Sequence, residues 1–596
     1  MKFFKSFLAS VLGTFVALFL VFLVFIIALF SSSSETEPYI RTNSVLKFDL
    51  MGDIPARASV DPFEELISGN ANVPVSLETL KNNLEKAAVD DNISAVWVNT
   101  NFVNASWANM QSAYKYFENF KNSTDKPLYF STDDIGFNEK SYYLATLADS
   151  VFSPPVTNFE FDGFVSQFTF YKPMLDKIGI EPEIFRVGKF KSAVEPYTSV
   201  ESSPESRFQT RELLDAAITT YVSAVAKKLD TTSEEVNNML NTPPVDRVNY
   251  AVENGLLDAI AFDSEIEQVI KNRIGLDEDD ELKTVSYSRY SKVSDRSAGL
   301  ETSEASERIA VIYTSGMILP DLPDSPFGNN QGITPGSVQK QLDLALDDDN
   351  TKAIVIHINS PGGSATSSDL IWHSIREASK KVPVIASMGS VAASGGYYMA
   401  MGADTVLAAE NTITGSIGIF RLMFNAEELL NENIGIMYET LKTHEYADLY
   451  DFTRPLTNAE RNVMQQDVEM GYETFLNRVA EGRGMTRDEV HEHAQGRVFT
   501  GVDAHEVGLV DILGDLDDAI AVAAEKAGIE DYQVETYPKS EDFLTSLFGS
   551  AEMRVQAMLS SWIPSNLMEE STSLRKILEQ PSGQNWMLLP GRFDIE

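Results

Sequence analysis

An internal duplication constrains the fold of this chain more than any other feature of its sequence. The matched segments are residues 80–98 with 338–356, 142–149 with 397–404, 178–180 with 434–436, and 255–258 with 508–511. The order of the segments is kept, and the offset drifts only from 258 to 253. Chance similarity would not keep the matched segments in the same order at a nearly constant offset. Because a repeat is a structural unit, we expect the chain of 596 residues to contain two similar halves.

We place these halves at residues 45–285 and 308–535. Residues 286–307, rich in Ser, Glu and Arg, are predicted to form a linker between them. Residues 536–596 form a less patterned tail, whose apolar stretches we expect either to pack on the body or to touch a membrane surface.

Each half alternates helical periodicity with short apolar runs. Leu80, Leu84 and Ala87 have the i, i+4, i+7 spacing of one helix face. Residues 96–98 and 354–358 are apolar and rich in β-branched side chains, which is typical of strands buried on both faces of a sheet. The alternation predicts an α/β fold with mostly parallel strands.

The N-terminal segment predicts one transmembrane helix. Residues 7–30 carry no charge and are long enough to cross about 30 Å of hydrocarbon. Lys2 and Lys5 precede them and acidic residues follow, so residues 1–6 are expected in the cytoplasm and the body outside. The alternative is a cleaved signal peptide. Its apolar region is normally shorter and ends at small residues, whereas this one ends at Phe30.

Composition excludes several classes of function. The chain has no cysteine, so it has no disulfide, no thiol nucleophile and no thiolate metal site. Its formal net charge of −41 repels nucleic acid, which is therefore not an expected partner. An acidic surface of this kind is most simply explained by solubility.

Ser394 is the candidate nucleophile. A predicted strand at residues 383–388 leads into Ala-Ala-Ser-Gly-Gly around Ser394, and a helix is expected to follow. A helix N-terminus favours developing negative charge, and the N–H groups of Gly395 and Gly363 are in a position to form an oxyanion hole. Gly363 belongs to a Pro-Gly-Gly turn after the strand at residues 352–358. The alternative is that Ser394 is an ordinary helix cap, a role that serine commonly has.

Histidine does not supply an obvious base for this serine. The six histidines are His357, His373, His444, His491, His493 and His505. His357 lies in a predicted buried strand, where a core histidine is the simpler interpretation. His491 and His493 are two residues apart, which is not the i, i+4 spacing of a zinc helix. We expect no metal and no other cofactor, and no P-loop or dinucleotide-binding fingerprint is found.

The duplication points to Lys191 as the base. In an alignment of the halves without gaps, Lys191 stands opposite Ala447, and Ser394 stands opposite Glu139. Each half thus carries a part that the other lacks. A desolvated lysine has a neutral amine that can accept a proton. The alternative is a solvated strand lysine, which is the interpretation favoured for Lys189.

Four motifs resemble the signal peptide peptidase A (protease IV) family in its long, duplicated form. They are Phe-Arg-Val-Gly-Lys-Phe-Lys-Ser-Ala-Val-Glu-Pro at 185–196, Asn-Ser-Pro-Gly-Gly-Ser at 359–364, Ala-Ala-Ser-Gly-Gly-Tyr-Tyr at 392–398 and Thr-Gly-Ser-Ile-Gly-Ile-Phe at 414–420. The resemblance covers roughly residues 45–530. It implies two tandem Clp protease/crotonase-like domains, Ser394 as nucleophile, Lys191 as general base and acid, and Ser416 as the group that orients the lysine.

The same resemblance implies a homotetramer on the outer face of the bacterial cytoplasmic membrane that degrades cleaved signal peptides and other apolar peptides. Two other functions remain open from the sequence. One is a crotonase-like enzyme that acts on an acyl-CoA thioester, since enzymes of that class use the same kind of oxyanion hole. The other is a membrane scaffold that has lost activity, although none of the motifs is damaged.

Overall fold

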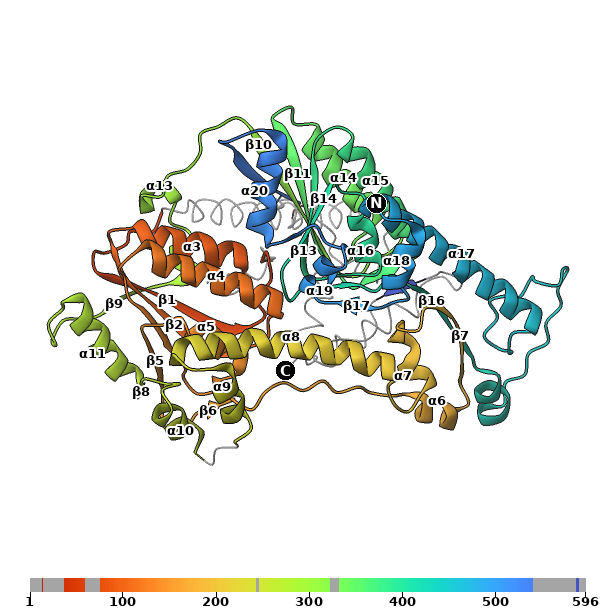
Figure 1. Ribbon diagram of the computed structural model, residues 1–596, viewed down its shortest axis with the longest axis horizontal. Helices are drawn as coiled ribbons and strands as arrows, with labels where there is room; N and C mark the ends of the chain where they lie inside the picture. The colour runs from red at the N-terminus through yellow and green to blue at the C-terminus, as the bar shows by residue number, and fades with distance from the viewer. Residues whose placement is uncertain are drawn as a thin grey trace, which may run out of the picture.

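The computed structural model describes residues 37–58, 75–242, 246–321, 332–539 and 586–588, together with Gly13. Two α/β halves lie side by side, the first in red to green and the second in green to blue (Figure 1). Within this described part of the chain, no helix is long and apolar enough to cross a membrane. The predicted span at residues 7–30 and most of the tail fall outside the described residues.

The first half is built on a six-stranded sheet in which every neighbouring pair is parallel. The strand order is β8-β5-β3-β2-β1-β9. The strands are β1 (Ser44–Gly52), β2 (Ile93–Val103), β3 (Leu128–Ser131), β5 (Ser150–Ser153), β8 (Ala259–Ile260) and β9 (Lys283–Ser286). The helices are α3 (Leu77–Val89), α4 (Trp107–Ser123), α5 (Glu139–Ala145), α6 (Lys172–Ile178), α7 (Glu195–Thr198), α8 (Pro204–Leu229), α9 (Ser233–Leu240), α10 (Arg247–Glu253) and α11 (Asp263–Ile274). A small separate sheet pairs β4 (Gly136–Phe137) with β6 (Asn158–Phe159).

The second half repeats this plan. Its main sheet has the order β17-β15-β13-β11-β10-β19, and β14 and β18 branch from β13. The strands are β10 (Arg308–Ser315), β11 (Thr351–Ser360), β13 (Val384–Ala393), β14 (Thr405–Ala408), β15 (Ile413–Gly415), β17 (Val498–Phe499), β18 (Ile512–Leu513) and β19 (Gln533–Tyr537). The helices are α14 (Pro335–Leu346), α15 (Ala365–Ser379), α16 (Gly395–Ala400), η2 (Leu429–Ile434), α17 (Asn458–Arg483), α18 (Arg487–His493), α19 (Gly501–Glu506) and α20 (Leu516–Ala527).

The predicted helix face and buried strands are confirmed. Leu80, Leu84 and Ala87 lie on α3 and are all buried against the first sheet. Val96 and Val98 in β2, like Ile354 in β11, are completely buried. Parallel strands with helices on their faces exclude water from both sides, which explains why these runs are apolar without alternation.

The predicted linker is not a free connection. Residues 286–307 contain α12 (Tyr287–Tyr290) and α13 (Asp295–Ala298), and Tyr290 is fully buried in the core of the first half. The Lys86 amine donates hydrogen bonds to the carbonyls of Tyr290 (3.4 Å) and Val293 (2.8 Å). Much of this segment therefore packs on the first half before the chain enters the second.

A third sheet joins the halves. Its order is β12-β20-β16-β7, with β12 (Gly362–Ser364), β16 (Ile419–Asn425) and β20 (Trp586–Leu588) from the second half and tail, and β7 (Glu181–Val187) from the first half. Strand β7 runs antiparallel to β16 over seven residue pairs. Helix α8 extends along both halves (Figure 1), and its Leu213 packs against Ala393 and Val498. The sequence between β7 and α8, which includes the short helix η1 (Ser192–Val194), is thereby held against the second half.

Candidate active site

Ser394 lies at the turn between β13 and α16, where the sequence analysis placed it. It occupies the N-cap position of α16, but its side chain makes no capping hydrogen bond. Its φ of 56° lies in the left-handed region, which is costly for a residue with a Cβ. Its backbone N–H donates to Gly415 O at 2.8 Å. A strained serine whose hydroxyl is not used as a cap has the features of a functional group rather than of an ordinary cap.

Lys191 reaches this serine from the first half. Its Nζ forms hydrogen bonds with Ser394 Oγ (2.8 Å), Ser416 Oγ (3.0 Å) and Ser416 O (3.1 Å). The side chain is completely buried, so the alternative of a solvated strand lysine is wrong. Burial lowers the pKa of Lys191 well below its ordinary value, because no carboxylate compensates the desolvated charge. Lys189 is exposed, as expected.

The loop that carries Lys191 fits against glycines that sequence reasoning missed. A Cβ on Gly496 would lie 2.7 Å from Lys191 Cβ, and a Cβ on Gly418 would lie 3.3 Å from its Cδ. The Phe190 N–H donates to Gln495 O at 3.0 Å, which fixes the loop to the second half. Gly418 belongs to the motif at residues 414–420, but Gly496 lies in no recognised motif. Only the folded contact reveals its role.

Gly363 and Gly395 lie next to each other beside the serine. A Cβ on Gly395 would come within 3.1 Å of Gly363 N, so the two backbones are in close approach. Ile318 N–H donates to Gly362 O, and Ser364 N–H donates to Ile318 O, both at 2.9 Å. Because successive residues of a strand turn their polar groups to opposite edges, the Gly363 N–H faces away from Ile318.

The corresponding place in the first half holds a different group. Glu139, which stands opposite Ser394 in the duplication, is buried at the start of α5. Its carboxylate accepts hydrogen bonds from the N–H groups of Asp162 and Gly163, each at 3.2 Å. Burial raises its pKa. In the first half, the turn that corresponds to the Ser394 turn is thus occupied by the Glu139 carboxylate, which is hydrogen-bonded to the neighbouring backbone.

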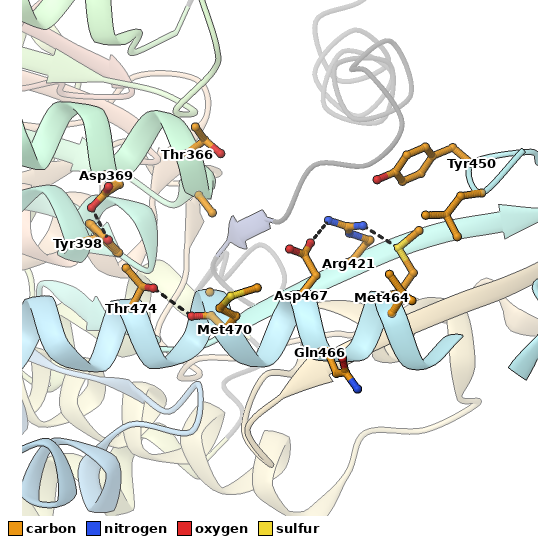
Figure 2. A pocket seen from close by; sticks show the side chains of 14 residues that line it. Thr366, Asp369, Tyr398, Arg421, Tyr450, Met464, Gln466, Asp467, Met470 and Thr474 are labelled. Carbon is orange, nitrogen blue, oxygen red and sulfur yellow. Dashed lines mark hydrogen bonds and ion pairs between the residues drawn. The ribbon is translucent and has the colours of Figure 1, made fainter. Parts of the chain in front are cut away.

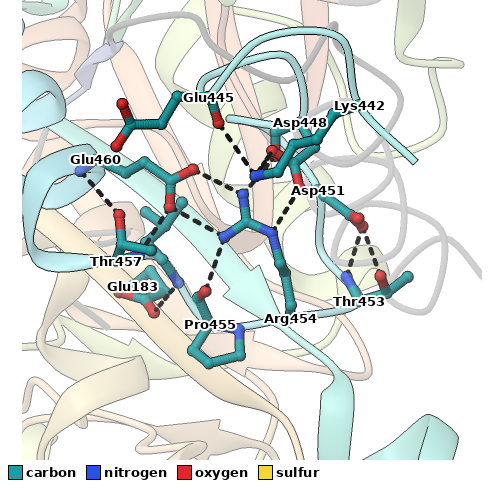
Figure 3. A network of polar contacts seen from close by, with 11 residues as sticks. Glu183, Lys442, Glu445, Asp448, Asp451, Thr453, Arg454, Pro455, Thr457 and Glu460 are labelled. Atoms are coloured by element: carbon teal, nitrogen blue, oxygen red, sulfur yellow. Dashed lines mark hydrogen bonds and ion pairs between the residues drawn. The ribbon is translucent and has the colours of Figure 1, made fainter. Parts of the chain in front are cut away.

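Strand β7 is held to the second half by charge as well as by backbone pairing. Glu183, buried on β7, accepts a hydrogen bond from Arg461 Nη2 at 2.6 Å, and Arg461 belongs to α17. The segment before α17 is fixed by Arg454, which binds Glu460 (2.7 Å) and Asp448 (2.8 Å), as Figure 3 shows. Pairing with Arg454 lowers the pKa of Glu460 to about 2. These contacts fix the strand that leads to Lys191.

A cavity of about 680 Å³ is lined by residues of α15, α16, β16 and α17 (Figure 2). Its walls combine apolar groups, including Met464 and Met470, with the buried Arg421 of β16. Arg421 donates to Asp467 Oδ2 at 2.5 Å, and Tyr398 donates to Asp369 at 2.7 Å. The lining residues are Ala365, Thr366, Asp369, Tyr398, Arg421, Leu449, Tyr450, Val463, Met464, Gln466, Asp467, Met470, Gly471 and Thr474.

His357 is buried in β11, as the sequence suggested. Its Nδ1 lies 3.3 Å from Ser387 Oγ, and its Nε2 has no hydrogen-bond partner among the described residues. Burial lowers its pKa to about 4. His491 lies on α18, with its Nδ1 2.9 Å from Tyr472 Oη. Within the described part of the chain, the Ser394 side chain hydrogen-bonds Lys191 and neither of these rings.

A serine hydroxyl beside a buried amine, with backbone N–H groups nearby, has the composition of a serine hydrolase site. The comparisons with known proteins agree with this class. The model of peptidase family S49 matches residues 121–277 and 376–530, once in each half, and the Clp protease model matches residues 330–414. The chain belongs to peptidase family S49 and is a serine peptidase.

Three relatives illustrate the extent of the similarity. The chloroplastic serine protease SPPA of Arabidopsis thaliana is 34% identical over 82% of this chain and 70% of its own length. Protease 4 of Salmonella typhi is 32% identical over 83% of this chain and 78% of its own length. The putative signal peptide peptidase SppA of Enterococcus faecium is 31% identical, over 42% of this chain and 73% of its own length.

Proposed function

We propose that the chain is a membrane-anchored endopeptidase that uses Ser394 as nucleophile and Lys191 as general base. The observation that carries this proposal is the 2.8 Å contact between Lys191 Nζ and Ser394 Oγ in a fully buried setting. A lysine can act as a base only when it is neutral, and burial without a counter-charge favours the neutral form.

The proposed reaction has two stages. Lys191 takes the Ser394 proton as the hydroxyl attacks the scissile carbonyl, and Gly363 and Gly395 donate their N–H groups to the oxyanion. Lys191 then protonates the leaving amine. In the second stage, Lys191 activates the water that hydrolyses the acyl ester. Ser416 holds the amine at 3.0 Å throughout and keeps it aimed at Ser394.

Apolar peptides, including signal peptides after their release from preproteins, are the proposed substrates. The cavity between α15, β16 and α17 offers Leu449, Val463, Met464 and Met470 to apolar side chains. The name of the Enterococcus relative, a putative signal peptide peptidase, supports the same class. The proposed site is the cytoplasmic membrane of a bacterium. Residues 7–30 would span the bilayer, with residues 1–6 inside and the body outside.

A homotetramer is proposed from the resemblance, and the duplication supplies a mode of assembly. Strand β7 of the first half pairs with β16 of the second. Their counterparts in the duplication are residues 437–443 and 164–170, and neither segment pairs as a strand within the described part of the chain. Residues 437–443 are exposed, with Met437 at 80% and Leu441 at 92%. Pairing of 437–443 with 164–170 of the next copy would repeat the internal contact and generate a ring.

Covalent labelling tests the central proposal. A fluorophosphonate probe should label the purified chain, the label should map to Ser394, and Ser394→Ala should abolish both labelling and casein cleavage. Turnover of an acyl-CoA thioester without peptide cleavage would instead favour the crotonase-like enzyme. Absence of both labelling and turnover would favour the scaffold. Native mass spectrometry of Leu441→Asp tests the assembly, since a buried charge at the interface should leave monomers.

A further inference from the structure

Gln209 is a buried residue of α8 whose side-chain amide contacts the loop that carries Lys191. Its Nε2 donates hydrogen bonds to Ser192 Oγ at 3.1 Å and to Phe190 O at 3.4 Å. These two residues stand immediately after and immediately before Lys191 in the chain. Gln209 is 1% exposed, so water does not compete for these bonds. One amide therefore holds the residues on both sides of the lysine.

The oxygen of the same amide binds the second half. The Val498 N–H in β17 donates to Gln209 Oε1 at 3.2 Å. Strand β17 ends the strand order of the main sheet, so this N–H has no neighbouring strand on that side within the described part of the chain. The orientation of the amide is fixed, because a backbone N–H can only donate and a carbonyl can only accept. Gln209 thus links the lysine loop to β17.

Strand β17 also fixes the part of the site that contains the serines. Val498 lies opposite Gly415 in the pairing of β17 with β15, and Gly415 O accepts the Ser394 N–H at 2.8 Å. The neighbouring Arg497 O accepts the Ser416 N–H at 2.7 Å. The strand that Gln209 binds therefore holds the backbone of the two serines that the lysine amine contacts.

The duplication associates this glutamine with the half that carries the lysine. Helices α8 and α17 follow β7 and β16 in their respective halves and have the same length of 26 residues. Aligned from their N-caps, Ser203 and Thr457, they place Val463 opposite Gln209. Val463 is 43% exposed and has no amide. A long helix at this place in the fold therefore does not itself require glutamine.

We infer that Gln209 is a positioning residue for the peptidase reaction, which holds the Lys191 loop against β17 so that the lysine amine meets Ser394. The inference rests on the proposed function, in which that amine is the base. Gln209 acts through the loop and the strand, and not on the reacting atoms. The effect is large because a displacement of about 1 Å can lower the rate of a reaction about 10²-fold.

Gln209→Met tests the inference, since methionine is unbranched and of similar length but has no N–H to donate and only a weakly accepting sulfur. The second-order rate constant for labelling of Ser394 by a fluorophosphonate should fall about 10- to 100-fold. On a peptide ester, kcat should fall by a similar factor while KM stays within about twofold. The final extent of labelling should match that of the wild type. A rate constant describes each folded molecule, so loss of stability alone does not change it.

Thr210→Val is the matched control. Thr210 is the next residue on α8, is buried, and donates its hydroxyl to Ser206 O at 2.9 Å within the same helix. This variant should keep the labelling rate constant within about twofold. Ser192→Ala removes one bond of Gln209 from the loop side without altering the helix, and should slow labelling about threefold. Combined with Gln209→Met it should slow labelling no further, because that bond is already lost.

Several outcomes would overturn the inference while leaving the peptidase intact. One is a Gln209→Met chain with the wild-type rate constant and kcat. A second is a reduced extent of labelling with an unchanged rate constant, which describes a purely structural role. A third is equal slowing in Thr210→Val, which assigns the effect to the packing of α8. A wild-type chain that neither reacts with the probe nor hydrolyses the ester contradicts the proposed function itself, and the positioning role with it.

Discussion

Lys191 Nζ lies 2.8 Å from Ser394 Oγ, although 203 residues separate the two in the chain and each belongs to a different half. The site is therefore formed by the docking of β7 and its following loop onto the second half. Every contact that fixes this docking, from the β7–β16 pairing to the Glu183–Arg461 ion pair, therefore helps to set the position of the Lys191 amine, the proposed base.

Lys191→Met should remove activity without unfolding the protein. Methionine fills similar volume but cannot accept a proton, so we expect kcat/KM on a peptide ester to fall about 10³-fold or more. The melting temperature should hold or rise, because the buried amine is replaced by an apolar group. Lys189→Met, which changes an exposed lysine two residues away, is the matched control and should retain full activity. Equal losses in both variants would contradict the role of Lys191.

The pH dependence follows from the lowered pKa of Lys191. A lysine that acts as the proposed base must be neutral, so kcat/KM should rise with pH as Lys191 loses its proton. The midpoint should lie well below the ordinary lysine value of about 10.4. In the window between those two pKa values the unfolded chain binds more protons than the folded chain. This group therefore makes the free energy of unfolding increase with pH there. A pH–rate profile measured on a peptide ester, with its midpoint at an ordinary lysine value, would refute the assignment.

Ser416→Ala should weaken catalysis without abolishing it. The Lys191 amine would keep its hydrogen bond to Ser416 O (3.1 Å) but lose the one to Ser416 Oγ (3.0 Å). Its position relative to Ser394 Oγ would therefore be less well fixed. We expect kcat to fall about 10- to 100-fold with little change in KM, because the loss affects proton transfer rather than substrate binding. Ser416→Thr, which keeps the hydroxyl, should recover part of kcat. A purely structural role would lower the melting temperature in proportion and would not be rescued in this way.

Gly496→Ala tests the close fit around Lys191. The added methyl group would lie 2.7 Å from Lys191 Cβ, which forces the loop away from Ser394. The control is Gly484→Ala, which also has a positive φ (63°) but has open space around the new methyl group. Both should lose about 1 kcal/mol of stability from backbone strain, whereas only Gly496→Ala should lose most of its activity. Comparison of melting temperature with kcat separates the two effects.

Glu183→Gln should loosen the contact between the halves. The change leaves Arg461, which is partly exposed, without its buried partner, and we expect a loss of about 1–2 kcal/mol after allowance for solvent screening. Activity should fall with it, because β7 leads to Lys191. Glu201→Gln breaks an exposed ion pair with Arg207 and should be neutral. Thermal unfolding and ester hydrolysis on the two variants provide the check.

Part of the fold was predictable from the sequence, because a strand that is buried on both faces, or a helix that is buried along one face, has a clear pattern of apolar residues. Leu80, Leu84 and Ala87 indicated α3, and the apolar run at 354–358 indicated β11. The linker was less predictable, because the burial of Tyr290 depends on a surface that the rest of the first half creates. The need for glycine at position 496 was not predicted for the same reason. A side chain there is excluded by Lys191, which lies 305 positions earlier in the chain.

The sequence by itself determined the duplication, the strand-to-helix turn at Ser394, and the complementary distribution of Ser394 and Lys191 between the halves. These features depend on the order of the residues and on local sequence patterns, which can be read directly from the sequence. Only the tertiary structure decided that Lys191 is fully buried, that its amine meets both Ser394 and Ser416, and that β20 lies opposite Gly363. Burial and register arise from packing between distant segments. The pKa of a lysine and the direction of an N–H group depend on that packing and not on neighbours in sequence.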